Sequence, residues 1–201
     1  MNIGIEGNIL IDALESKLFG IGSEAYVVGS AMTKDMMLCL DSGHFHPTES
    51  IGDKISAILT FSDQLLLHLS RGIRWDSDHV VILNDELLNI TQEVVRNNVL
   101  DRVHFALDFF DASINRITAW VTGSRAALKA ILYALLEPKE LLQEEERKGN
   151  FGNRLALQEE FKSLPLGAVW DKYCLGRQAP VGAEWIKRVM EYEERILRKR
   201  R

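Results

Sequence analysis

Short apolar runs that alternate with helical patterns constrain the fold of this chain more than any other feature. The runs are MMLCL (36–40), LLLHL (65–69) and VHFAL (103–107). Between them, residues 48–61 and 85–100 carry apolar side chains at helical spacing. This order is typical of βα units around a parallel sheet, with strands covered on both faces. An earlier run, residues 9–14, fits either a fourth strand or the start of a helix.

The chain after residue 107 changes to helical patterns alone. Helices are predicted over residues 114–136, over 141–164 with a Gly-Asn break, and over 183–198. Pro138, Pro165 and Pro180 fall between or beside these segments, as prolines do where helices begin and end. We therefore expect two parts: a βα part over residues 1–136, and a helical extension over residues 137–201 that packs on it.

Composition argues against several classes of protein. The 201 residues are 46% hydrophobic, and a net charge of −5 argues against a nucleic-acid binder held by phosphate contacts. Cys39 and Cys174 form no C-x-x-C pair, so neither a disulfide framework nor a zinc ribbon is indicated. No run approaches the ~20 apolar residues of a membrane span, and the start has no secretory pattern. We expect a cytoplasmic protein.

Side chains that bind metals lie where the predicted strands end. Asp41, His68 and Asp108 come at or beside the carboxyl end of a strand, and Glu15 follows the earliest apolar run. The carboxyl ends of parallel strands converge on one rim, so we expect these four residues to meet. Three carboxylates and one imidazole suit Mn²⁺, Mg²⁺ or Co²⁺ better than a thiolate-bound zinc.

A second group of polar residues lies next to the first. His44 is three residues past Asp41, and Asp76 and Asp78 follow the His68 strand in RWDSDH. Alternate residues of an extended loop point the same way, so Asp76 and Asp78 can face one ion together. The pattern predicts two metals on a shared rim. Taken singly, each residue also fits a structural role, the aspartates in turns or caps and His68 as a hydrogen-bonded core histidine.

The remaining polar residues have structural interpretations or none. Asp111 is predicted to cap the N-terminus of the helix that runs through residue 114. Three histidines have no assigned role: His46, His79 and His104. The charged run over residues 144–148 is interpreted as a solvated helix face.

Several longer stretches resemble the L-rhamnose isomerase family. They are ALESKLFGIGSEAYVVGS, CLDSGHFHPTE, DKISA, LLLH, IRWDSDHVV and LDFFDASINRI, with KSLP and EWIKRVMEYEERIL nearer the C-terminus. The resemblance runs from about residue 11 onward, and residues 1–8 match nothing in it. It implies a partial (β/α)₈ barrel of the xylose-isomerase-like kind with a C-terminal helical extension, and a two-metal site usually occupied by manganese.

The resemblance also implies residue roles and a reaction. Four residues would hold a structural, substrate-orienting metal: Glu15, Asp41, His68 and Asp108. Three would serve the catalytic metal: His44, Asp76 and Asp78. The reaction is the reversible conversion of L-rhamnose to L-rhamnulose, with hydrogen moving between C1 and C2 while cations hold the charge on O1 and O2. The implied cofactor is Mn²⁺, with Mg²⁺, Co²⁺ or Zn²⁺ as substitutes, and the family is tetrameric.

The chain departs from the family in two ways. Family members are roughly twice this length, in keeping with the few predicted strands against the eight of a barrel. We expect this chain to correspond to the later half, without the first strands and the acid-base residues on them. The segment between Ser30 and Met36 is also shorter than in the family. Parallel neighbours need a connection of about a dozen residues, so the placement of Glu15 beside Asp41 is left open.

These departures leave two hypotheses about function. In one, the chain is an L-rhamnose isomerase polypeptide whose catalysis needs the missing half in trans or from a second copy. In the other, it is a non-catalytic metal- or sugar-binding remnant of such an enzyme. Turnover of L-rhamnose separates the two, because metal binding alone is expected of both.

Overall fold

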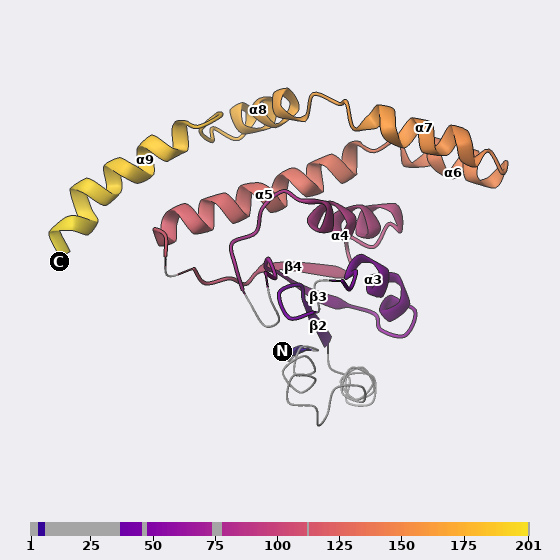
Figure 1. The fold of residues 1–201 in the computed structure, drawn as a ribbon, viewed down its shortest axis with the longest axis horizontal. Helices are drawn as coiled ribbons and strands as arrows, with labels where there is room; N and C mark the ends of the chain where they lie inside the picture. Colours follow the sequence, from indigo (N-terminus) through magenta and orange to yellow (C-terminus); the bar gives the residue numbers. More distant parts are fainter. Residues whose placement is uncertain (1–3, 7–36, 46–47, 74–77, 112, 201) are drawn as a thin grey trace. The chain divides into compact units, whose positions relative to one another are not determined.

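The computed structural model describes residues 4–6, 37–45, 48–73, 78–111 and 113–200. The chain divides into two compact units, Met1–Ala134 and Leu135–Arg201, and each is described by itself. The first unit is mixed α/β with a small parallel sheet, and the described part of the second is helical (Figure 1).

Among the described residues, the sheet of the first unit has four parallel strands in chain order. They are β1 (Gly4–Glu6), β2 (Met37–Asp41), β3 (Leu65–Leu69) and β4 (Val103–Leu107), and the sheet order is β1-β2-β3-β4. The register places Asp41 opposite His68, and His68 opposite Ala106. Two helices connect the last three strands: α3 (Gly52–Leu59) and α4 (Asp85–Arg96).

The apolar core lies on one face of this sheet. Leu65, Leu67 and Leu69 are almost fully buried and pack with residues of both crossover helices, including Ile55 and Val94. The intervening residues of β3 are only partly buried, and β4 is more exposed still. Burial on both faces was therefore a correct prediction for β2 but a wrong one for β4. In β4, Val103 is part of the core and Phe105 packs against it, while the other side chains of the strand are partly or fully exposed.

Local signals explain where the helices begin. Asn84 accepts a hydrogen bond from the Leu87 amide with its side chain and so caps α4. Asn115 does the same for the long helix α5 (Arg116–Leu136) through the amides of Ile117 and Thr118.

The interpretation of Asp111 as the cap of this helix is wrong. Its carboxylate accepts hydrogen bonds from the amide and hydroxyl of Ser113 instead. Asp111 therefore shapes a turn before the helix, a role that aspartate fills as readily as it fills a cap. The pKa of Asp111 lies below its ordinary value because of these hydrogen bonds.

The second unit consists of consecutive helices. They are α6 (Lys139–Arg147), α7 (Phe151–Phe161), α8 (Leu166–Gly176) and α9 (Glu184–Tyr192), followed by π and 3₁₀ turns at Glu193–Leu197 and Arg198–Arg200. Gly149, with φ of 72°, lies in the predicted break between α6 and α7. Pro138 and Pro165 directly precede α6 and α8, consistent with proline at helix starts.

The structure confirms the three main strands and the two crossover helices within a few residues. It adds two elements that were not predicted, strand β1 and helix α8. The run at residues 9–14 lies outside the described residues. Within the described residues, no helix is long and apolar enough to cross a membrane.

Candidate metal centre

Asp41 ends strand β2 and is fully buried. Its Oδ1 atom accepts hydrogen bonds from the Gly43 amide and the Ser70 hydroxyl, both at 2.8 Å. The Ser42 hydroxyl in turn accepts a hydrogen bond from the Ser70 amide at 2.9 Å, which joins the ends of β2 and β3. One carboxylate oxygen is thereby fixed by the protein, and the orientation of the other, Oδ2, is set with it.

The first group of possible ligands gathers around His68 on β3. The Nδ1 atom of His68 lies 3.3 Å from Asp41 Oδ2 and 3.1 Å from Asp108 Oδ2. The three residues come from the ends of three neighbouring parallel strands, as the rim argument predicts. Their ligand atoms all lie within 4.8 Å of one another, a spacing that one ion can bridge.

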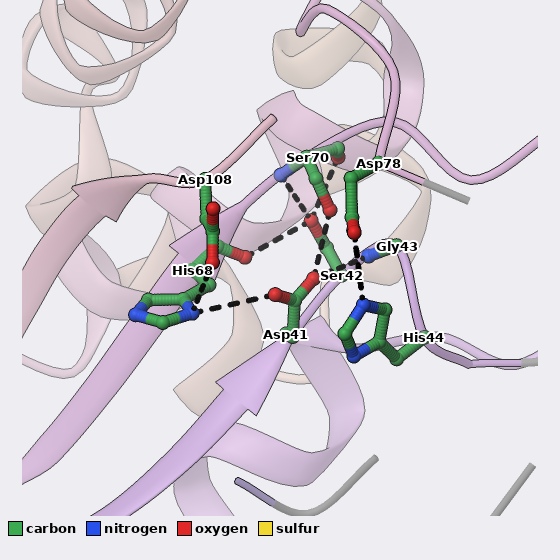
Figure 2. Close-up of polar contacts among 8 residues, drawn as sticks. All are labelled: Asp41, Ser42, Gly43, His44, His68, Ser70, Asp78 and Asp108. Atoms are coloured by element: carbon green, nitrogen blue, oxygen red, sulfur yellow. Dashed lines mark hydrogen bonds and ion pairs between the residues drawn. The ribbon is translucent and has the colours of Figure 1, made fainter. Parts of the chain in front are cut away.

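The second group lies on the other side of Asp41. His44 is buried in the loop after β2, and its Nε2 atom lies 3.0 and 3.2 Å from the two oxygens of Asp78. Asp41, His44 and Asp78 also have ligand atoms within 4.8 Å of one another. Figure 2 shows Asp41 between the two histidines, so a single carboxylate belongs to both groups.

The electrostatics of the site follow from these contacts. Burial alone raises the pKa of Asp41, but hydrogen bonds from His68, Gly43 and Ser70 outweigh it and hold that pKa below its ordinary value. The Asp41 carboxylate, helped by Cys39, raises the pKa of His68 to about 10 against the opposing effect of burial. Without a metal, the carboxylate is therefore ionised and the imidazole protonated at neutral pH.

The donor set fits a divalent cation. In the part of the chain that the structure describes, two buried carboxylate oxygens face an imidazole nitrogen without a well-aligned hydrogen bond: Asp41 Oδ2, 3.3 Å from His68, and Asp78 Oδ1, 3.0 Å from His44. A buried carboxylate oxygen with weak hydrogen bonding is costly, and a bound cation would satisfy it. Oxygen and imidazole ligands without thiolates suit Mn²⁺, Mg²⁺ or Co²⁺.

The structure brings five of the predicted ligands together: Asp41, His44, His68, Asp78 and Asp108. Glu15 and Asp76 lie outside the described residues, as does His46. Of the unassigned histidines, His79 lies 3.9 Å from Asp111, and His104 is exposed on β4. The prediction gave Asp41 to one metal alone, and here Asp41 lies among the possible ligands of both groups.

Sequence reasoning missed the residues that support Asp41. Ser42 directly follows Asp41, and Ser70 directly follows the run LLLHL that contains His68. Both serines therefore lie at strand ends, as the possible ligands do. Serine at such a position is a weak signal, since it is common in turns. Only the contact of Ser70 with the carboxylate, shown in Figure 2, separates a supporting hydroxyl from a turn residue.

The chain matches one protein family over nearly its whole length. The family model described as L-rhamnose isomerase (RhaA) covers residues 1–200. The chain belongs to the L-rhamnose isomerase family. Because this match begins at residue 1, the expectation that residues 1–8 lie outside the resemblance is wrong. Members of the family use divalent metals, in agreement with the donor set above.

Named relatives give the same result. An L-rhamnose isomerase of Rhodopirellula baltica is 58% identical over 94% of this chain and 46% of its own length. The enzyme of Mannheimia succiniciproducens is 56% identical over 98% of the chain and 49% of its own length. The L-rhamnose isomerase of Yersinia pseudotuberculosis is 56% identical over 94% of this chain and 47% of its own length. The chain spans about half the length of these curated relatives.

Proposed function

We propose that this chain supplies the metal centre of an L-rhamnose isomerase, an enzyme that interconverts L-rhamnose and L-rhamnulose. The observation that carries the proposal is the pair of carboxylate–imidazole groups that share Asp41 at the ends of parallel strands. Membership of the family points to L-rhamnose as the substrate. The two groups could each hold one divalent cation, and two such cations would assist the isomerisation.

The isomerisation requires charge to be held while hydrogen moves. One hydrogen passes from C2 to C1 of the sugar, and the hydroxyl proton passes from O2 to O1. Divalent cations at the two groups would stabilise the negative charge that develops on these oxygens. Asp41, Asp108 and His68 would hold the substrate-orienting cation, and His44 and Asp78 the catalytic one.

Neighbouring residues would keep this geometry fixed. The Gly43 amide and the Ser70 hydroxyl hold one oxygen of Asp41 so that the other faces His68. His44 Nε2 and the Asp78 carboxylate lie within hydrogen-bond distance, so this pair can hold a proton before a cation displaces it. Preorganised ligands lose little conformational freedom when a cation binds.

The finer parts of the proposal rest on the family. Glu15 would complete the first group and Asp76 the second. Residues 1–136 would form part of a xylose-isomerase-like (β/α)₈ barrel, and residues 137–201 its helical extension. Mn²⁺ would be the cation, the assembly a homotetramer, and the location cytoplasmic.

The test is formation of L-rhamnulose from L-rhamnose with added Mn²⁺. The purified chain is assayed alone and mixed with the part of the Rhodopirellula baltica enzyme that this chain does not match. Asp78→Asn is assayed alongside, with Asp101→Asn as the matched control because Asp101 is exposed and precedes β4.

We expect ketose from the mixture, loss of that ketose with Asp78→Asn, and no loss with Asp101→Asn. Ketose that forms equally in both variants would contradict the roles given to the second group. Bound Mn²⁺ without turnover under either condition would favour the non-catalytic metal-binding alternative. Neither metal binding nor turnover would contradict the proposal as a whole.

A further inference from the structure

A glycine in the middle of helix α5 needs a physical explanation. Gly123 is buried within this 21-residue helix, whose other buried residues are alanines. Glycine weakens a helix interior relative to alanine, so an alanine would be the better choice here on helix propensity alone.

The ring of Phe109 explains the glycine. A Cβ atom added to Gly123 would lie only 2.6 Å from Cε1 of Phe109 and closer still to Cζ. The ring also packs against the main hydrophobic core, so it cannot swing aside freely. Gly152 in helix α7 differs, since a Cβ added there would meet nothing within 4 Å.

Phe109 belongs to the segment that carries the site. It directly follows Asp108, whose amide donates a hydrogen bond to the Leu69 carbonyl at 3.3 Å. It directly precedes Phe110, whose amide donates to the Asp78 carbonyl at 3.1 Å. The segment thus connects a ligand of the first group to a ligand of the second through main-chain hydrogen bonds.

The packing of the Phe109 ring therefore helps to set the positions of Asp108 and Asp78. The side chain of Asp108 is 55% exposed. It has little packing of its own to hold it 3.1 Å from His68. The ring next to it is packed against the core and against the bare surface of α5 at Gly123. Movement of the ring would shift the Asp108 backbone and, through Phe110, the Asp78 loop.

We propose that Gly123 is a positioning residue of the metal centre, acting through Phe109 on Asp108 and Asp78. The inference rests on the proposed metal centre and adds to it a residue that lies on a helix outside the rim. The effect of Gly123 passes through the ring of Phe109 and the two main-chain hydrogen bonds.

The experiment compares Gly123→Ala with Gly152→Ala by Mn²⁺ titration calorimetry and by hydrogen exchange of the metal-free protein. Alanine at Gly123 should raise the Kd for Mn²⁺ on the order of tenfold, as expected when an indirect support of a ligand is lost. It should also speed exchange of the Phe110 amide. Gly152→Ala should leave both quantities unchanged.

A double variant separates positioning from general damage. Phe109→Leu shortens the ring that meets Gly123, so Gly123→Ala combined with Phe109→Leu should bind Mn²⁺ as well as Phe109→Leu alone. Phe109→Leu alone should weaken Mn²⁺ binding, because leucine lacks the ring that packs against the core and against Gly123. That single variant decides the matter if Gly123→Ala does not fold.

Two results would overturn the inference about Gly123, and a third would contradict the proposed metal centre as well. A folded Gly123→Ala protein that binds Mn²⁺ like the unmodified chain overturns it, as does a Phe109→Leu protein that does so. An unmodified chain that binds no Mn²⁺ contradicts the proposed metal centre itself. The unmodified protein therefore shows which of the two proposals has failed.

Discussion

Asp41 and Asp108 both lie close to Nδ1 of His68, but Asp41 is buried and Asp108 is exposed. Asp41 is fully buried, and protein donors fix one of its oxygens. The side chain of Asp108 is 55% exposed, and its position depends on the backbone that carries it. The comparison teaches that a candidate metal group combines a rigid carboxylate that lies in both groups with an adjustable one that lies in a single group.

Replacing Asp41 with asparagine should have the largest effect. The change removes a charge from both groups and leaves the protonated His68 without its buried partner. Breaking a buried ion pair costs about 3–5 kcal/mol of the free energy of unfolding. We expect Mn²⁺ binding at both groups to be lost. Calorimetry and thermal unfolding of the metal-free protein measure the two effects. Retention of either bound ion would contradict the shared role of Asp41.

Replacing Ser70 with alanine should have an intermediate effect. Asp41 Oδ1 loses one of its two donors, and leaving a buried polar group less well satisfied costs about 1–3 kcal/mol. The hydrogen bond from Ser70 is one of the causes that hold the pKa of Asp41 below its ordinary value. The ionised Asp41 therefore stabilises the fold at pH values above that ordinary pKa, and this stabilisation is lost as the pH falls through the lowered pKa. Acid unfolding of the variant should begin at a higher pH. Circular dichroism against pH measures this shift, and Ser163→Ala serves as the exposed control because the Ser163 hydroxyl donates to a main-chain carbonyl.

Replacing Asp108 with asparagine should affect one group only. Mn²⁺ binding at the first group should weaken, while the group of Asp41, His44 and Asp78 still binds an ion. Because the side chain is more than half exposed, the free energy of unfolding should change by less than about 1 kcal/mol. Electron paramagnetic resonance of titrated Mn²⁺ counts the bound ions. Equal losses from both groups would remove the distinction between the two aspartates.

Raising the pH should have the mildest effect and should act through His68. The pKa of His68 is raised to about 10, chiefly by Asp41, from an ordinary value near 6.5. The stabilisation from the protonated imidazole is therefore full below about pH 6.5 and is lost as the pH rises towards 10.

Mn²⁺ must displace that proton, so its affinity should rise between pH 6 and 8 by up to about tenfold per pH unit. Calorimetry in buffers of different ionisation enthalpy measures the proton released. An affinity that does not change with pH would show that His68 is neutral before the metal binds.

The same comparison explains how much the sequence predicts. Asp41, His68 and Asp108 lie at or beside the ends of apolar runs, and parallel strands bring such positions to one rim, so their meeting is predictable. The place of Asp41 in both groups is not predictable, because it depends on where His44 and Asp78 place their side chains. The support of Asp108 by Phe109 and Gly123 involves residues fourteen positions apart, whose contact no local pattern reveals.

The errors in the fold have similar physical causes. Asp111 and Asn115 both suit a helix start, and only the hydrogen bonds show that Asn115 is the cap. Strand β1 has three residues, too few for a period-two pattern. Helix α8 buries only Trp170 and Cys174, which lie one turn apart on the same face, and two buried positions are too few to define a helical pattern.

Anomalous diffraction from crystals grown with Mn²⁺ tests the central claim most directly. Our account predicts two manganese peaks, one among Asp41, His68 and Asp108 and the other among Asp41, His44 and Asp78, with Asp41 contacting both ions. Manganese at only one group, or ions bound elsewhere while Asp41 contacts neither, would contradict it.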